Sequence, residues 1–150
     1  MPIETDIKQA VFRTPFHRAL VNVIYTSNWI GDRQMRTLKP YKLTLHQYNV
    51  LRILRGQHPN PVKVSDITER MLDKMSNASR LVDKLLAKHL VQRTECPTDR
   101  RAVDVVITDA GLELLKKLDT VQDAWTAHIH ENMSEDEAIQ LSRLLDRIRS

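Results

Sequence analysis

The chain has 150 residues, of which 41% are hydrophobic and 28% charged, with only three glycines and six prolines. This length can build one compact domain, and the composition excludes collagen-like, low-complexity and mostly disordered proteins. Cys96 is the single cysteine, which excludes an intramolecular disulfide and a Cys-rich zinc site. We therefore expect a folded, helix-rich protein from a reducing compartment.

The N-terminal segment lacks the charged start and apolar run of a signal peptide. No stretch approaches the roughly 18 to 20 apolar residues that a membrane span needs. These two features predict a cytoplasmic protein.

The basic side chains are concentrated in the middle of the chain, whose formal net charge is +4. Residues 33–63 carry seven basic side chains and no acidic one, whereas residues 102–150 carry five basic and ten acidic side chains. A basic middle is typical of a surface that binds a polyanion such as nucleic acid. The alternative is a solvated surface with a chance skew in charge.

The first predicted helix begins at Thr14, a good N-cap, followed by Pro15 at the first helical position. Its apolar residues, beginning with Phe16, recur at helical spacing and predict an inward face. The helix should end near Pro40, because proline cannot continue a helix.

The second predicted helix begins with a capping box, in which Thr44 and Gln47 are three residues apart. Apolar residues follow at Tyr48, Leu51, Ile53 and Leu54, and the helix should end near Gly56. This helix lies within the basic middle of the chain.

Residues 64–72 read as a short helix with Ser65 as its cap and three inward side chains, Ile67, Met71 and Leu72. Only residues 73–75 separate it from the next helix. Two helices joined by such a short turn are typical of a helix-turn-helix, whose second helix commonly enters the DNA major groove. An ordinary helical hairpin is the alternative on spacing alone.

Residues 76–90 form the most periodic segment, with apolar residues at helical spacing on one face. Ser76 is the predicted N-cap. The opposite, exposed face is expected to carry Ser76, Arg80, Asp83, Lys84 and Ala87, with Asn77 and Lys88 on its flank.

After residue 90 the spacing of the apolar residues changes from that of a helix to that of β-strands. This pattern predicts a β-hairpin with strands in residues 91–96 and 102–108 and a turn in residues 97–101. Two adjacent arginines, Arg100 and Arg101, lie near the predicted tip. A hairpin directly after a helix-turn-helix is a wing, and arginines at its tip suit a narrow, electronegative minor groove.

Two helices are predicted after the hairpin. Thr108 caps a long helix, and Ser134 with Glu137 makes a capping box for the last one. The terminal helices carry more apolar face than one small winged domain can cover. We therefore expect them to pack together and against a second copy of the chain.

The segment of residues 79–111, SRLVDKLLAKHLVQRTECPTDRRAVDVVITDAG, resembles the recognition helix, wing and following helix start of the MarR family of bacterial transcription regulators. Its most specific parts are residues 80–85, the Asp-x-Arg of residues 99–101 and the turn of residues 108–111. The element order matches over most of the chain.

The resemblance implies a mostly α fold with a small β-hairpin wing. A winged helix-turn-helix lobe would span residues 44–108, and the N- and C-terminal helices, residues 1–40 and 109–150, would form an obligate homodimer. The whole chain, residues 1–150, would then be a single MarR-type unit.

The resemblance also implies the site. Ser76, Asn77, Ser79 and Arg80 lie where the family reads base edges and phosphates, and Arg101 lies where the wing arginine enters the minor groove, held by Asp99. Lys84 on the exposed face and Arg100 in the wing complete the candidate DNA-binding set. Many relatives have glycine at the positions of Asp73 and His89, so we expect slight strain there, because only some side chains tolerate a positive φ.

Several other residues are candidates for further chemistry. Cys96 is better explained as a packing residue than as a redox sensor, and His128 and His130, two apart, fall on different helix faces, which disfavours a metal site. An effector cleft could be lined by side chains of the types found at Tyr25, Trp29, Arg33 and His46. We favour the simpler interpretation, in which Trp29 belongs to the core and Arg33 to the basic surface. Three consecutive acids at residues 135–137 suit a helix N-terminus.

The sequence thus predicts a dimeric, sequence-specific DNA-binding transcription regulator, a repressor released by a small aromatic or anionic effector, acting on a pseudo-palindromic operator. No enzyme motif, cofactor or metal is expected. Two alternatives stay open: a small-molecule or redox sensor acting through protein partners, and a non-specific architectural DNA binder.

Overall fold

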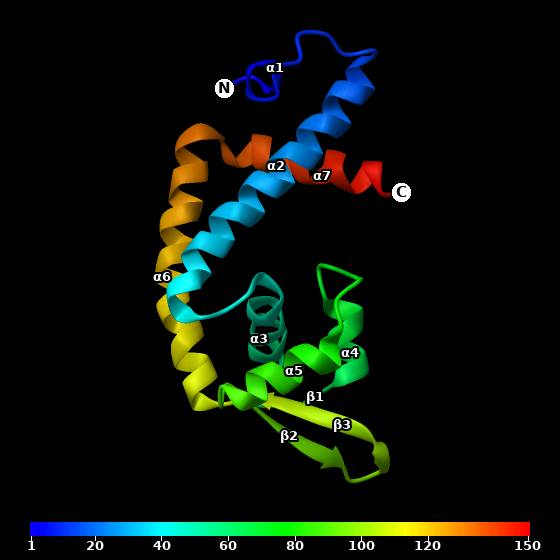
Figure 1. Cartoon of the computed structure of the whole chain (residues 1–150), viewed down its shortest axis with the longest axis vertical. Helices are drawn as coiled ribbons and strands as arrows, with labels where there is room; N and C mark the ends of the chain where they lie inside the picture. The colour runs from blue at the N-terminus through cyan, green and yellow to red at the C-terminus, as the bar shows by residue number, and fades with distance from the viewer. The chain divides into compact units, whose positions relative to one another are not determined.

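The computed structural model describes residues 1–150, with the exception of the side chains of Arg100 and Arg101. The chain divides into two compact units, Met1–Asn49 and Val50–Ser150. The division falls inside helix α3 (Leu45–Gln57). Figure 1 shows the elements of each unit.

The first unit is built mainly from α2 (Pro15–Leu38), followed by the short 3-10 helix η1 (Lys39–Tyr41). The Thr14 hydroxyl accepts a hydrogen bond from the backbone N–H of His17 at 3.1 Å, which satisfies one of the unpaired donors at the helix start. The predicted start and end of this helix are confirmed.

A four-residue helix that was not predicted, α1 (Ile3–Asp6), lies beside the N-terminal end of α2 (Figure 1). Its Ile3 side chain is buried, and the Glu4 carboxylate accepts a hydrogen bond from Arg18 Nε at 2.6 Å. This hydrogen bond lowers the pKa of Glu4. The ion pair fastens the N-terminal segment to the first turns of α2.

The apolar face of α2 is not buried within the chain, although the sequence predicts an inward face. Phe16 is 81% exposed and Ile24 is 62% exposed. Trp29 is 44% exposed, so the interpretation of this residue as core is wrong for the single chain. The periodicity identified an apolar face but not what covers it.

Helix α3 begins with the predicted capping box. The backbone N–H of Gln47 donates to the Thr44 hydroxyl at 3.1 Å, and the Thr44 N–H donates to Gln47 Oε1 at 3.3 Å. Tyr48, Leu51 and Leu54 are buried as predicted, and the helix ends one residue after Gly56.

In the described part of the second unit the sheet has three antiparallel strands, β1 (Val62–Lys63), β2 (Val91–Cys96) and β3 (Asp99–Ile107), in the order β1-β3-β2. The predicted hairpin is therefore confirmed, and β1 adds a strand that the sequence did not reveal. The turn comprises only residues 97 and 98, because β3 begins at Asp99 and not at residue 102. Val91 opposes Ile107, and Val62 opposes Val105.

The helix pair of this unit is α4 (Val64–Arg70) and α5 (Ala78–Ala87). Both helices are shorter than predicted. Ser65 does not cap α4, which begins directly after the extended residue Lys63, and Leu72 is 88% exposed instead of inward. The chain leaves the helix after Arg70, so Leu72 falls outside the apolar face.

A single apolar core joins the sheet to the helices of the second unit. Its fully buried side chains come from both helices of the pair, from the sheet and from the helix that follows β3. They are Ile67 and Met71 at α4, Val82 and Leu85 on α5, Val91 and Val105 in the sheet, and Leu115 after β3. Burial of this area is the main force that fixes α5 on the hairpin.

The unit continues with α6 (Asp109–Asn132) and α7 (Glu135–Ile148). Thr108 caps α6 by accepting from the Gly111 N–H at 3.1 Å, and Ser134 and Glu137 form the predicted reciprocal box of α7. Of the helices in the described part of the chain, none combines the length and apolar character needed to cross a membrane.

Candidate nucleic-acid interface

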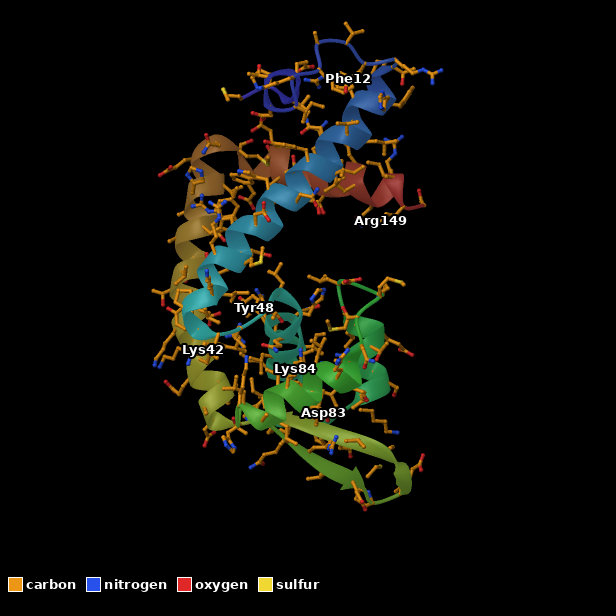
Figure 2. The ribbon with its side chains drawn as sticks, in the orientation of Figure 1. Phe12, Lys42, Tyr48, Asp83, Lys84 and Arg149 are labelled. Carbon is orange, nitrogen blue, oxygen red and sulfur yellow. The ribbon has the colours of Figure 1, made fainter. Side chains whose placement is uncertain are left out.

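Helix α5 has one buried face and one polar face. Ala78, Val82 and Leu85 are buried beneath it. We call the opposite side the outward face of α5; it consists of the exposed residues Ser79, Arg80, Asp83, Lys84 and Ala87. Figure 2 labels Asp83 and Lys84 on this helix. The helix thus offers short polar and basic side chains on a rigid support.

The start of α5 lies one residue later than predicted. Asn77, not Ser76, is the N-cap, and its Oδ1 accepts from the Arg80 N–H at 3.0 Å. The Ser76 hydroxyl is buried and has no hydrogen-bond partner among the described residues. Both residue types cap helices well, so the sequence did not distinguish the two positions.

The turn that leads into α5 is held by Asp73. Its carboxylate accepts from the Met75 N–H at 2.9 Å, and its carbonyl accepts from the Ser76 N–H at 3.2 Å. Lys74 donates to the carbonyl of Glu69. Asp73 does not have a positive φ, so the strain expected at this position is absent; its side chain builds an Asx-type turn instead.

The end of α5 is tied to the start of α6. His89 has a φ of 58°, as expected from its place where relatives have glycine. The Thr108 hydroxyl donates to the His89 carbonyl at 2.8 Å, and the Thr108 N–H donates to the Leu90 carbonyl at 3.0 Å. A Cβ on Gly111 would lie 2.5 Å from the Leu90 oxygen, so only glycine permits this close approach.

The hairpin that follows α5 is the candidate wing. Asp99 begins β3 and opposes Cys96, next to an irregularity between Glu95 and Cys96. Arg100 and Arg101 lie in β3, but their side chains are outside the described residues. The predicted contact between Asp99 and Arg101 therefore stays a prediction.

Cys96 is buried at the end of β2, in agreement with its interpretation as a packing residue. Its Sγ lies 3.2 Å from the Thr98 hydroxyl. The hydrogen bond with this hydroxyl, supported by the backbone at Thr98 and Asp99, lowers the pKa of the thiol. The thiol is nevertheless covered, which limits its reaction with oxidants.

Two ion pairs in the second unit were not found from the sequence. Arg93 on β2 donates to Asp83 on α5 at 2.9 Å, and Arg55 donates through both terminal nitrogens to Asp119 on α6 at 2.7 and 3.1 Å. The two partners are 10 positions apart in the first pair and 64 positions apart in the second, so only the folded chain brings them together. Not every basic residue of the middle segment is therefore available to a polyanion.

The histidines and the acidic run were the other candidates for chemistry. Among the residues that the structure describes, no group of three His, Cys, Asp or Glu side chains is arranged to hold a metal ion. The acids Glu135, Asp136 and Glu137 occupy the first turn of α7, where they oppose the positive end of the helix dipole.

Residues 43–103 match the model of the MarR family. The HTH-type transcriptional repressor MdtR of Bacillus subtilis is 31% identical over 79% of this chain and 76% of its own length. The chain belongs to the MarR family. The HTH-type transcriptional regulator BilQ of Clostridioides difficile is 30% identical, over 76% of each chain.

Solved structures agree with this MarR-family assignment. The crystal structure of a MarR transcription factor from Planctomyces limnophilus is 31% identical, covers 91% of this chain and 98% of its own, and has a TM-score of 0.68. A mutant MarR from E. coli complexed with operator DNA has a TM-score of 0.73 at 24% identity, with 87% of this chain and 93% of that chain covered, which supports the fold. The predicted winged helix-turn-helix fold is confirmed.

The MarR-family chain is a DNA-binding transcription regulator and not an enzyme. Its candidate interface is the N-terminal part of α5 together with the hairpin. Within it the structure brings Asn77, Ser79, Arg80 and Lys84 onto one helix, and places Asp99 in the strand that follows the turn.

Proposed function

We propose that this MarR-family regulator is a homodimer that reads a pseudo-palindromic operator with α5 in the major groove and the hairpin in the minor groove. The observation that supports this most is the outward face of α5, which is polar and basic while the opposite face is buried against the sheet. A helix held in this way keeps its geometry when it meets DNA.

Within this proposal each candidate residue has a chemical role. Arg80 donates to a base edge, because a guanidinium can bond guanine through two atoms, and Lys84 contacts phosphate. Asn77 uses its Oδ1 as the helix cap, which leaves its amide N–H groups for a phosphate oxygen. Ser79 contacts a base or phosphate beside Arg80.

Ser76 requires a different role from the one that the family resemblance implies, because its hydroxyl is buried. We propose that it acts by shaping the helix start. In the wing we assign Arg101 to the minor groove, Arg100 to phosphate and Asp99 to positioning of Arg101.

The second part of the proposal is dimerisation through the terminal helices. Leu144 and Ile148 of α7 are 46% and 50% exposed, and Phe16, Leu20 and Ile24 of α2 are also exposed. Apolar faces of this size are costly in water, and a second copy of the chain would cover them. Two lobes would then meet two half-sites.

The third part concerns regulation. The relative MdtR is named as a repressor, and we propose that this chain also represses, in the cytoplasm, until a small aromatic or anionic effector releases it. In vitro, release of a bound operator by such an effector without loss of fold would support this part.

Selection of bound genomic fragments with the purified protein tests the function. We expect enrichment of a few fragments that share a pseudo-palindrome. An affinity for enriched fragments equal to that for random duplex would instead identify an architectural DNA binder. Failure to bind duplex at low salt would favour the sensor that acts through protein partners.

Single substitutions then test the site on the enriched fragment. Arg80→Ala should cost about 1–3 kcal/mol of binding free energy and relax the choice at one base pair. Arg101→Ala should weaken binding at matched salt. Lys116→Ala, which removes an exposed charge of α6, is the control and should leave sequence preference unchanged. A uniform loss over all sequences would make Arg80 a phosphate contact.

A further inference from the structure

A carboxylate lies in the centre of the outward face of α5. Asp83 stands four residues after Ser79 and four before Ala87, on the same side of the helix, and its side chain is 61% exposed. A negative charge at this position repels DNA phosphates. Its presence on a surface proposed to bind DNA therefore needs an explanation.

Arg93 supplies one. It lies on β2, opposite Val105 of β3, and its Nη1 is 2.9 Å from Asp83 Oδ1. The ion pair neutralises Asp83 and joins the outward face of α5 to the wing. Arg93 is itself 46% exposed, so its guanidinium lies within reach of solvent and of an approaching polyanion.

Stability alone does not account for this pair. Both side chains are solvent-exposed, and exposed ion pairs add little to folding because water and salt screen them. The buried side chains of Val82, Leu85 and Val91 already fix α5 on β2. The main effect of this ion pair is therefore expected on DNA binding and not on folding stability.

We propose that Asp83 is a specificity-determining positioning residue, which keeps the guanidinium of Arg93 from binding the phosphates of any DNA sequence. Phosphate contacts raise affinity for all sequences alike, whereas base contacts discriminate. By engaging Arg93, Asp83 lowers non-specific binding and leaves discrimination to the rest of the outward face. This inference rests on the proposed DNA interface.

The proposal predicts that the effect of Asp83 depends on Arg93. In Asp83→Asn the released guanidinium gains a phosphate contact. Affinity for random duplex should rise several-fold, and the slope of log affinity against log salt should steepen by about 0.9. The ratio of operator to random affinity should fall.

The decisive comparison is a double-mutant cycle of Asp83→Asn and Arg93→Gln, measured on the selected fragment and on random duplex of equal length over a salt series. When Asp83→Asn is added to the Arg93→Gln variant, the slope should not steepen, because no guanidinium is released. Glu95→Gln, which removes an exposed negative charge from the same strand, is the control for net charge. Thermal unfolding of each variant should stay close to that of the parent.

Three results would overturn the inference: a slope unchanged by Asp83→Asn, the same change when Arg93→Gln is already present, or the same change in Glu95→Gln. A wild-type protein that does not prefer the selected fragment would instead contradict the proposed function. A wild-type protein that discriminates, with no coupling in the cycle, would contradict this inference alone.

Discussion

Helices α5 and α7 carry the same kind of apolar stripe, but the chain buries only one of them. Leu85 of α5 is completely buried under the sheet, whereas Leu144 of α7 is 46% exposed. Helical periodicity therefore identifies the apolar face of each helix without telling whether the same chain covers it. In the proposed function the covered helix presents its polar side to DNA, and the uncovered one presents its apolar side to a second copy of the chain.

The largest effect on folding is expected at the covered stripe. Leu85→Ala should lower the free energy of unfolding by about 2–5 kcal/mol, because it leaves a cavity in the core that joins α5 to β2. Urea denaturation followed by circular dichroism measures this loss. Leu72→Ala removes the same atoms from a side chain that is 88% exposed, and it should change stability by less than about 0.5 kcal/mol. Equal losses would contradict the contrast in burial.

The uncovered stripe should matter for assembly. Leu144→Glu places a charge on the apolar face of α7 and should convert the dimer to monomers in sedimentation experiments. Binding to a two-half-site operator should then fall by about 100-fold or more, because the lobes are no longer linked.

Ser142→Glu introduces the same charge at an exposed polar position on the opposite side of α7 from Leu144, and should leave the dimer intact. If Leu144→Glu also remained dimeric and folded, the apolar face of α7 would not be the dimer contact.

Local signals predicted the starts of four helices, α2, α3, α6 and α7, but not those of α4 and α5. The caps at Thr14, Thr44, Thr108 and Ser134 all depend on residues three positions apart, so the sequence contains the whole interaction. Strand β1 was missed because two residues show no periodicity, and it pairs with β3, which is distant in the sequence: Val62 opposes Val105.

The candidate site was predictable only in part. The outward face of α5 followed from the spacing of its apolar residues, but the partner of Asp83 did not, because the fold alone brings Arg93 beside it. Leu72 was placed inward by extending the helix pattern past Arg70, where the chain had already turned. Opposite charges on a helix and on the next strand are a signal that could be sought in other sequences.

Gly111 and Gly56 differ in how much space a side chain would have at each position. Gly111→Ala should destabilise the protein by about 1–3 kcal/mol, because the new Cβ would lie 2.5 Å from the Leu90 carbonyl oxygen. Gly56→Ala, in α3, meets none of the described atoms within 4 Å and should stabilise by about 0.5–1 kcal/mol. Urea denaturation of both variants compares them directly. Destabilisation by both would show that glycine matters at position 56 for another reason.

The smallest effect concerns the box that starts α7, and it depends on pH. The Glu137 carboxylate accepts from the Ser134 N–H at 2.9 Å and from its hydroxyl at 2.8 Å, and these bonds lower the pKa of Glu137 below its ordinary value of 4.5. Because the folded-state pKa is the lower one, the stabilisation is present above pH 4.5 and is lost as the pH falls through the folded value. Glu137→Gln should therefore lower the melting temperature slightly at neutral pH, and the difference from wild type should vanish in acid. Glu135→Gln removes a neighbouring charge outside the box, so an identical pH profile would assign the effect to the helix dipole instead of the capping bonds.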